Sequence, residues 1–206
     1  MRTGLIILML VMLAGASAWA TNIDPYDEEE QYVWSENVGW IDAKANGDGM
    51  EVTSGKVMGY LWSSSVGWIN LYPRSSDPAV GVKNDGQGNL SGLAWGENVG
   101  WINFDPKVPN SKVDYGVKID ADGYFSGWAW GENIGWINFN SASLAPYGAR
   151  VCIVKLEDLE RFASQWLRSG YIYAADLNRD YQVDFADFAL FAKLWLDYCP
   201  CDWGLK

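Results

Sequence analysis

A ten-residue motif built around two tryptophans occurs four times and constrains the fold of this chain more than any other feature. Each copy has a Trp, a short polar stretch, a Gly and a second Trp, and the copies occupy residues 34–43, 62–71, 95–104 and 130–139. Their starts are 28, 33 and 35 residues apart, a spacing typical of modular repeats. Catalytic chemistry is seldom spread over four equivalent copies, so the repeats favour a scaffold or a binding surface over a catalyst.

Each full repeat is predicted to form three short antiparallel strands. In the last repeat these are residues 115–119, 124–130 and 134–139, separated by Gly, Asn and Asp. Aromatic and β-branched residues between such breaks are typical of hairpins, and a helix through these windows would contain several interior glycines. We therefore expect a mainly β repeat domain over residues 31–150, arranged as a closed barrel or a propeller-like array.

The two ends of the repeat region suggest how the array closes. The first copy lacks a leading strand, whereas residues 147–151 follow the last copy and resemble residues 115–119. If 147–151 pairs beside the first copy, the ends of the domain meet and its sheet has no free edge. Closure is a hypothesis at this point, because natural sheets protect their edges in several other ways.

The tryptophans have two competing interpretations. Strand alternation puts Trp101 and Ile102 on opposite faces, so both faces carry apolar side chains and the sheet is expected to be covered on both sides. Exposed indoles would form platforms for sugar rings with polar rims, and the residues then contacting a glycan would be Trp95, Trp101, Trp128, Trp130, Trp136, Glu97 and Glu132. The alternative is that the indoles fill the core while the Glu-Asn pairs only form turns. The regular spacing favours core filling.

The repeats nominate no catalytic residue. A glycosidase needs two carboxyl groups facing each other across the scissile bond, whereas each candidate Glu lies in its own equivalent loop. The chain has no His, which removes the usual general base, the usual zinc ligand and every Ser-His or Cys-His nucleophile pair. We therefore expect a non-catalytic scaffold or ligand-binding protein. A carbohydrate-binding component of a polysaccharide-degrading assembly is the alternative, and a glycoside hydrolase is the third class.

The beginning of the chain predicts export. Residues 1–20 carry one charge, an apolar run and the small-residue ending Ala18-Trp19-Ala20, which is the pattern of a secretory signal peptide. An acidic segment, residues 21–30, follows, and we expect a secreted protein, extracellular or on the cell surface, with no membrane span. The net charge of −11 repels nucleic acid and anionic lipid, so nucleic acid is not an expected partner.

A twelve-residue loop near the C-terminus has the spacing of a calcium site. Oxygen-bearing side chains fall at loop positions 1, 3, 5, 9 and 12, with a backbone carbonyl expected at position 7; the residues are Asp176, Asn178, Asp180, Asp184, Asp187 and, at position 7, Gln182. Calcium takes six to eight hard oxygens, which a loop of this length wraps around one ion. Position 6 is Tyr181, where such loops normally bend through Gly, so we expect a weakened or strained site. The alternative is an acidic, capped helix start.

The segment around this loop is an internal duplication. Residues 154–167 match residues 183–196 at an offset of 29, with apolar residues at steps of three and four, which predicts two amphipathic helices. Neither helix could bury its apolar face alone. We therefore expect the two helices of residues 151–206 to pack against each other.

The duplicated loop-and-helix pattern over about residues 150–200 resembles a dockerin type I module, the calcium-dependent unit by which secreted proteins attach to cohesin receptors. In the second half the ligand positions of that family are present, whereas in the first half only Asp158 remains, which implies one calcium ion. The family's partner-reading positions 10 and 11 hold Phe185 and Ala186, or Leu156 and Glu157. A cohesin-like or cell-surface partner is the expectation, and an internal helix pair stabilised by calcium is the alternative.

Three cysteines in an exported chain suggest one disulfide and one leftover thiol. Cys152 precedes the first predicted helix, whereas Cys199 and Cys201 follow the second. Those ends meet in an antiparallel helix pair, so Cys152 is expected to bridge to Cys199 or to Cys201. The alternative is that all three are reduced, small apolar residues.

Overall fold

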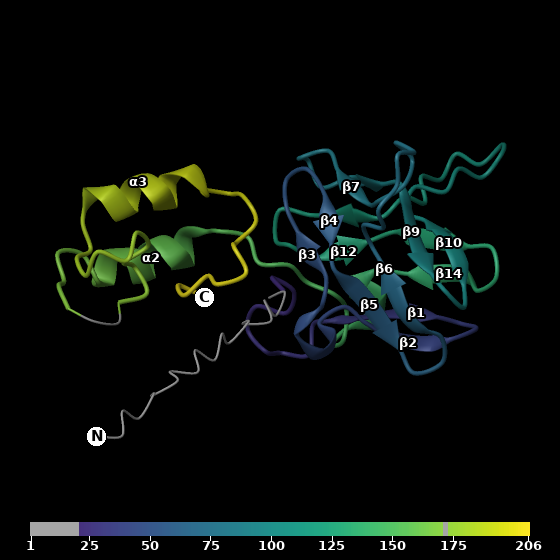
Figure 1. Ribbon diagram of the computed structural model, residues 1–206, viewed down its shortest axis with the longest axis horizontal. Helices are drawn as coiled ribbons and strands as arrows, with labels where there is room; N and C mark the ends of the chain where they lie inside the picture. The colour runs from purple at the N-terminus through teal and green to yellow at the C-terminus, as the bar shows by residue number, and fades with distance from the viewer. Residues whose placement is uncertain (1–20, 171–172) are drawn as a thin grey trace, which may run out of the picture.

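The computed structural model describes residues 21–170 and 173–206, so the predicted signal peptide lies outside the described residues. Within them, eight four-residue strands form a closed antiparallel barrel in which each copy of the tryptophan motif supplies one hairpin (Figure 1). The barrel strands are β1 (Tyr32–Ser35), β2 (Gly39–Asp42), β5 (Tyr60–Ser63), β6 (Gly67–Asn70), β9 (Leu93–Gly96), β10 (Gly100–Asn103), β13 (Trp128–Gly131) and β14 (Gly135–Asn138). The predicted β class is confirmed, and the array is a barrel.

The hypothesis of closure is confirmed. β1 pairs with β14, which joins the first and last repeats. Beside this seam the Tyr32 N–H donates to the Tyr147 carbonyl at 2.9 Å, and Arg150 bridges Tyr124. Residues 147–151 therefore take the place of the leading strand that the first copy lacks, and the barrel has no open edge.

The prediction of three continuous strands per repeat is wrong in one respect. The segment 124–130 is not one strand, because Gly127 breaks it with φ +84°. A Cβ at Gly127 would lie 2.2 Å from the Gly116 carbonyl oxygen, so the chain passes too close to its neighbour to continue straight. The part before the glycine instead forms a two-stranded hairpin outside the barrel. These hairpins are β3 (Glu51–Val52) with β4 (Val57–Met58), β7 (Lys83–Asn84) with β8 (Leu90–Ser91), and β11 (Lys118–Ile119) with β12 (Phe125–Ser126).

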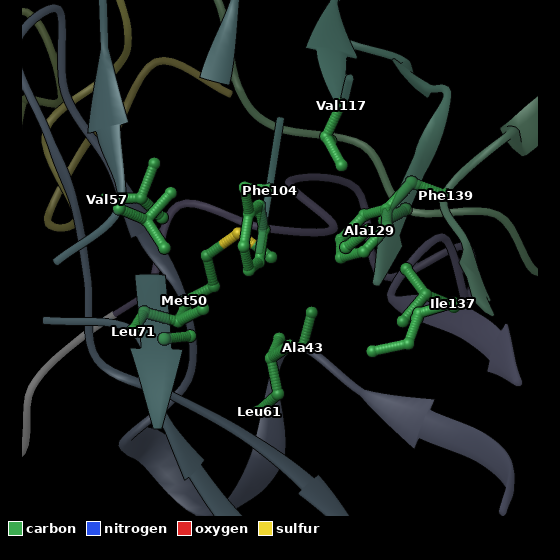
Figure 2. Close-up of a cluster of buried hydrophobic side chains, with 14 of the residues drawn as sticks. Ala43, Met50, Val57, Leu61, Leu71, Phe104, Val117, Ala129, Ile137 and Phe139 are labelled. Atoms are coloured by element: carbon green, nitrogen blue, oxygen red, sulfur yellow. The ribbon is translucent and has the colours of Figure 1, made fainter. Parts of the chain in front are cut away.

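The core lies inside the barrel and continues under the outer hairpins. The motif isoleucines Ile41, Ile69, Ile102 and Ile137 are all fully buried, as are residues that directly follow the barrel strands, such as Phe104 and Phe139. Figure 2 shows this cluster, with Ile137, Leu61 and Ala129 from barrel strands beside Met50, Val57 and Val117 from the outer segments. An eight-stranded barrel has an interior just wide enough for its own side chains.

A ring of hydrogen bonds ties the four hairpin loops together at one end of the barrel. The Nδ2 of Asn37 donates to the Ile134 carbonyl, and each following loop donates to the loop before it in sequence. The other donors are Asn133 to Val99, Asn98 to Val66, and the Ser65 hydroxyl to Val38, all at 3.0–3.1 Å. The second copy, which lacks the Asn, therefore closes the ring with Ser65.

This ring predicts that the Asn of each Glu-Asn pair contributes more to stability than the Glu. Replacing Asn133 by Ala removes one side-chain bond to a loop carbonyl and should lower the free energy of unfolding by about 1 kcal/mol. Glu132→Ala changes an exposed neighbour that makes no such bond in the ring and should change it by less than about 0.5 kcal/mol. Urea unfolding measures both, and equal effects of the two substitutions would contradict the structural role assigned to the asparagine.

A pair of helices follows the barrel. α2 (Leu156–Ser164) and α3 (Phe185–Lys193) lie side by side at one end of the molecule (Figure 1), and the Phe162 and Phe191 rings meet between them at 5.2 Å. Short helical turns lie in the barrel domain, η1 (Ala45–Gly47) and α1 (Ser141–Leu144). None of the helices in the described part of the chain is both long and apolar enough to cross a bilayer.

The two halves of the helix pair repeat the same backbone contacts. The Leu167 N–H donates to the Val183 carbonyl, and 29 residues further on the Leu196 N–H donates to the Val154 carbonyl. The expected internal duplication therefore corresponds to a pseudo-twofold arrangement of the two helices and the segments next to them.

Asn22 joins the acidic N-terminal segment to both parts of the molecule. Its side chain is almost completely buried and donates to the carbonyls of Val52, in an outer hairpin of the barrel, and Cys199, in the helical module. The backbone carbonyl of Asn22 accepts a hydrogen bond from the Cys152 N–H. The N-terminal segment thus contributes to the junction between the barrel and the helices.

Candidate functional site

The tryptophans of the repeats lie on the outer face of the barrel, so the core-filling interpretation is wrong. The most exposed is Trp40, at 44%, and the others above a third are Trp62, Trp68, Trp95, Trp101 and Trp130. Trp34, Trp128 and Trp136 are half-buried. Because the narrow interior takes the alternate isoleucines, the indoles must point outward, and the sheet is not covered on both sides. We call these nine residues the tryptophan belt.

Each hairpin presents its two indoles as a cross-strand pair. Trp95 lies opposite Trp101 with ring centroids 4.6 Å apart, and Trp130 lies opposite Trp136 at 4.9 Å. Both pairs meet edge to face, a favourable geometry for aromatic rings. Five residues predicted to contact a glycan, namely Trp95, Trp101, Trp128, Trp130 and Trp136, therefore belong to two neighbouring hairpins joined by the β10–β13 pairing.

The predicted acidic partners of the belt lie elsewhere. Glu97 and Glu132 are exposed in the hairpin loops, beside the asparagines that form the loop ring. The polar residues in register with the belt are instead the last residues of β6 and β10, where Asn70 lies opposite Trp95 and Asn103 opposite Trp130. Their Oδ1 atoms accept from the N–H two residues later, which orients the amides.

The structure shows a groove at the belt that the sequence did not predict. An open cavity of about 690 Å³ lies on the second repeat and is lined by aromatic rings and three polar side chains. Its lining includes Tyr60, Trp68, Tyr72, Asp48, Asn70 and Arg74. None of the predicted glycan-contacting residues is among them. The sequence signal that could have found it is Asp48 before Gly49, where the chain elsewhere has Tyr115 before Gly116 and Tyr147 before Gly148.

The side chains of the predicted calcium loop accept hydrogen bonds from backbone N–H groups of the same loop. The Asp180 N–H donates to both Asp176 Oδ1 and Asn178 Oδ1, at 3.0 and 2.9 Å, so oxygens of positions 1 and 3 converge on one amide. Asp180 Oδ1 accepts from the Gln182 N–H at 3.0 Å. Tyr181 at position 6 has φ +71°, the left-handed conformation that Gly adopts more easily.

The last predicted ligand, Asp187, is completely buried. Its oxygens accept from the N–H groups of Asn178 and Asp184, at 3.0 and 2.9 Å, and Asp184 in turn caps α3. The equivalent Asp158 of the first half is also buried and accepts from Lys155 and the Trp203 indole.

The donor chemistry of the loop fits calcium, because carboxylate, amide and carbonyl oxygens are the ligands it prefers. Within residues 21–170 and 173–206, no three His, Cys, Asp or Glu side chains gather into a cation-binding group.

Apolar side chains are exposed at equivalent places in both halves of the helical module. Phe185 and Leu156, the residues at loop position 10, are 78% and 59% exposed. Leu167 and Leu196, which follow the ends of α2 and α3, are 75% and 66% exposed. Exposed apolar residues gathered on one small module are typical of an interaction surface.

The structure joins Cys152 to Cys199 and leaves Cys201 as a thiol. The disulfide lies where the segments flanking the two helices meet, since the Cys199 N–H donates to the Cys152 carbonyl. Burial, reinforced by the nearby Glu51 carboxylate, raises the pKa of the Cys201 thiol to about 12.

The raised pKa predicts a poorly reactive thiol, because the thiolate is the nucleophile and a group with pKa near 12 stays protonated at pH 8. Iodoacetamide at pH 8 should label native Cys201 much more slowly than the unfolded chain, and the rate should rise as the pH approaches 12. Peptide mass spectrometry measures the labelling. Glu51→Gln should accelerate it; native labelling as fast as that of a free cysteine would contradict the assignment.

Comparison with models of protein families, with curated proteins and with solved structures found no match. The functional conclusion therefore depends on the chemistry of the tryptophan belt, the groove and the C-terminal loop.

Proposed function

We propose that this chain is a secreted, non-catalytic glycan-binding protein that attaches to a partner through its C-terminal helical module. The observation that carries the proposal is the exposure of the tryptophan belt. Monomeric proteins seldom expose contiguous apolar surface without a binding role, and here the exposed residues are large rings repeated around a barrel.

The belt has the chemistry that sugar rings require. An indole offers a flat apolar surface to the C–H face of a pyranose, and oriented amides such as Asn70 and Asn103 supply hydrogen bonds for hydroxyl groups. The belt is built on short strands that both neighbours hold in register, so ordering it for a ligand carries a small entropic cost. A rigid scaffold that displays several similar platforms fits a polysaccharide, whose units also repeat.

Glycan binding is tested with soluble glucans, mannans, xylans and galactans. At least one should shift the tryptophan fluorescence of the wild-type protein and retard it in an affinity gel. Replacing both Trp68 and Trp101 by Ala should raise the Kd at least about tenfold, about 1.4 kcal/mol. Trp195→Ala is the matched control, because it removes an indole of similar exposure, 41%, from α3's C-terminal side and should leave binding unchanged.

Silence of the wild-type protein across the whole panel would reject the glycan proposal in favour of a purely structural surface protein. Release of reducing sugar from any of these polysaccharides would instead support the hydrolase class.

The attachment module is proposed to be dockerin-like and to bind one calcium ion. The loop from Asp176 to Asp187 supplies the donors, with the Gln182 carbonyl at position 7, and the ion would supply charge that holds the carboxylates together. The exposed pair Phe185 and Leu156 then offers apolar anchors for a cohesin-like or other cell-surface protein.

If calcium binds this loop, it should increase the thermal stability of the protein, and this increase should depend on Asp180. A ligand present at a hundredfold excess over its Kd stabilises the folded state by about 2.7 kcal/mol, so calcium should raise the melting temperature of the wild-type module and EGTA should reverse the rise. Asp180→Ala should abolish the calcium-dependent part, whereas Glu160→Ala, an exposed acid on α2, should retain it. Calorimetry with and without calcium measures both; a melting temperature indifferent to calcium in the wild type would refute the site.

A further inference from the structure

The residue before a glycine occupies an equivalent place beside three barrel hairpins. In the sequence these are Asp48-Gly49, Tyr115-Gly116 and Tyr147-Gly148. In each case the carbonyl of the first residue accepts a hydrogen bond from the first N–H of a barrel strand, donated by Tyr60, Trp128 and Tyr32 at 3.0, 2.7 and 2.9 Å. The three positions therefore face the same part of the tryptophan belt. In the third repeat the carbonyl that accepts from the first strand N–H, that of Leu93, belongs to Ala79, at 3.0 Å.

Tyrosine rings cover the belt at two of these positions. The Tyr147 ring packs 5.9 Å from Trp40 and 6.4 Å from Tyr32, edge to face. The Tyr115 ring lies 5.1 Å from Trp136 with the ring planes inclined by only 32°. At each place the belt therefore already holds a six-membered ring that belongs to this chain.

The second repeat lacks this ring and has a groove instead. Asp48 stands where the tyrosines stand, and its side chain is too short to supply such a ring. Tyr60 is 37% exposed whereas its counterpart Tyr32 is half-buried, and Trp68, at 42%, is as open to solvent as its counterpart Trp40, at 44%. Asp48, Tyr60 and Trp68 line the cavity of about 690 Å³. The contrast with repeats one and four shows that the aromatic wall accepts a six-membered ring, and in the second repeat that place is open beside an acid.

We infer that this groove is a subsite for one neutral pyranose ring, bound where Tyr115 and Tyr147 lie in their own repeats; the inference rests on the proposed glycan-binding function. The aromatic wall formed by Tyr60 and Trp68 covers the apolar face of the sugar. Asp48 accepts hydrogen bonds from hydroxyl groups, and Arg74 and the Asn70 amide donate to them. The net charge of −11 disfavours an anionic sugar at this surface.

The inference is tested by filling the groove in the way the other repeats do. Asp48→Tyr introduces the ring that repeats one and four already contain, so the protein should fold with an unchanged or higher melting temperature. Isothermal titration is carried out on the full chain with neutral tetrasaccharides of glucose, mannose, xylose and galactose. The wild type should bind at least one of them at one site per chain, and Asp48→Tyr should weaken that binding at least about tenfold.

Two further variants make the test independent of how well Asp48→Tyr folds. Tyr115→Asp opens the equivalent place in the fourth repeat and should add a second site of similar chemistry. Asp48→Ala keeps the groove open but removes the carboxylate, so binding should weaken while the stoichiometry stays at one. Tyr147→Phe is the control, because it keeps the covering ring and should change neither affinity nor stoichiometry.

The outcomes separate the subsite from the general function. Binding by the wild type that Asp48→Tyr leaves unchanged would overturn the subsite while glycan binding by the belt stands. Tighter binding of tetragalacturonate than of the neutral sugars would overturn the neutral-sugar assignment. Failure of every tetrasaccharide and every polysaccharide to bind the wild type would reject the proposed function and the subsite together.

Discussion

Pairing of β1 with β14 is the contact on which the rest of the structure depends. It converts four similar hairpins into a closed barrel, and closure defines an inside and an outside. The inside of an eight-stranded barrel has room for branched aliphatic side chains but not for indoles, so Ile41 and its three counterparts are buried. The tryptophans that alternate with them are consequently exposed, and the surface chemistry of the protein follows from that exposure.

Within the motif, separate residues maintain the fold and form the surface. The isoleucine fills the core, the glycine before the second tryptophan adopts positive φ in the hairpin loop, and the asparagine ties one loop to the next. The two tryptophans are in register across each hairpin. Because the repeats share this framework, the places where they differ become informative, and the contrast between Asp48 and Tyr115 is the clearest of them.

The C-terminal module also uses the same contacts in each of its two halves. Buried Asp158 and Asp187 occupy equivalent positions and each accepts backbone N–H groups at a helix start. The Cys152–Cys199 disulfide joins the segment before α2 to the segment after α3, while Asn22 connects this module to an outer hairpin of the barrel. The apolar residues left exposed lie at both ends of the helices, with Phe185 at the start of α3 and Leu167 and Leu196 beyond the ends of α2 and α3.

The hairpins, the duplication of the helices and the oxygen spacing of the loop could be predicted from the sequence, because they are local patterns with glycine and asparagine at the breaks. The sequence could not determine which face of each strand is buried, since Trp101 and Ile102 are both apolar and alternate. That choice was made by barrel closure, which joins residues about a hundred positions apart, Trp34 to Asn138. The groove likewise exists only in the folded chain, because it arises where Asp48 fails to cover Tyr60 and Trp68, and only long-range packing brings those residues together.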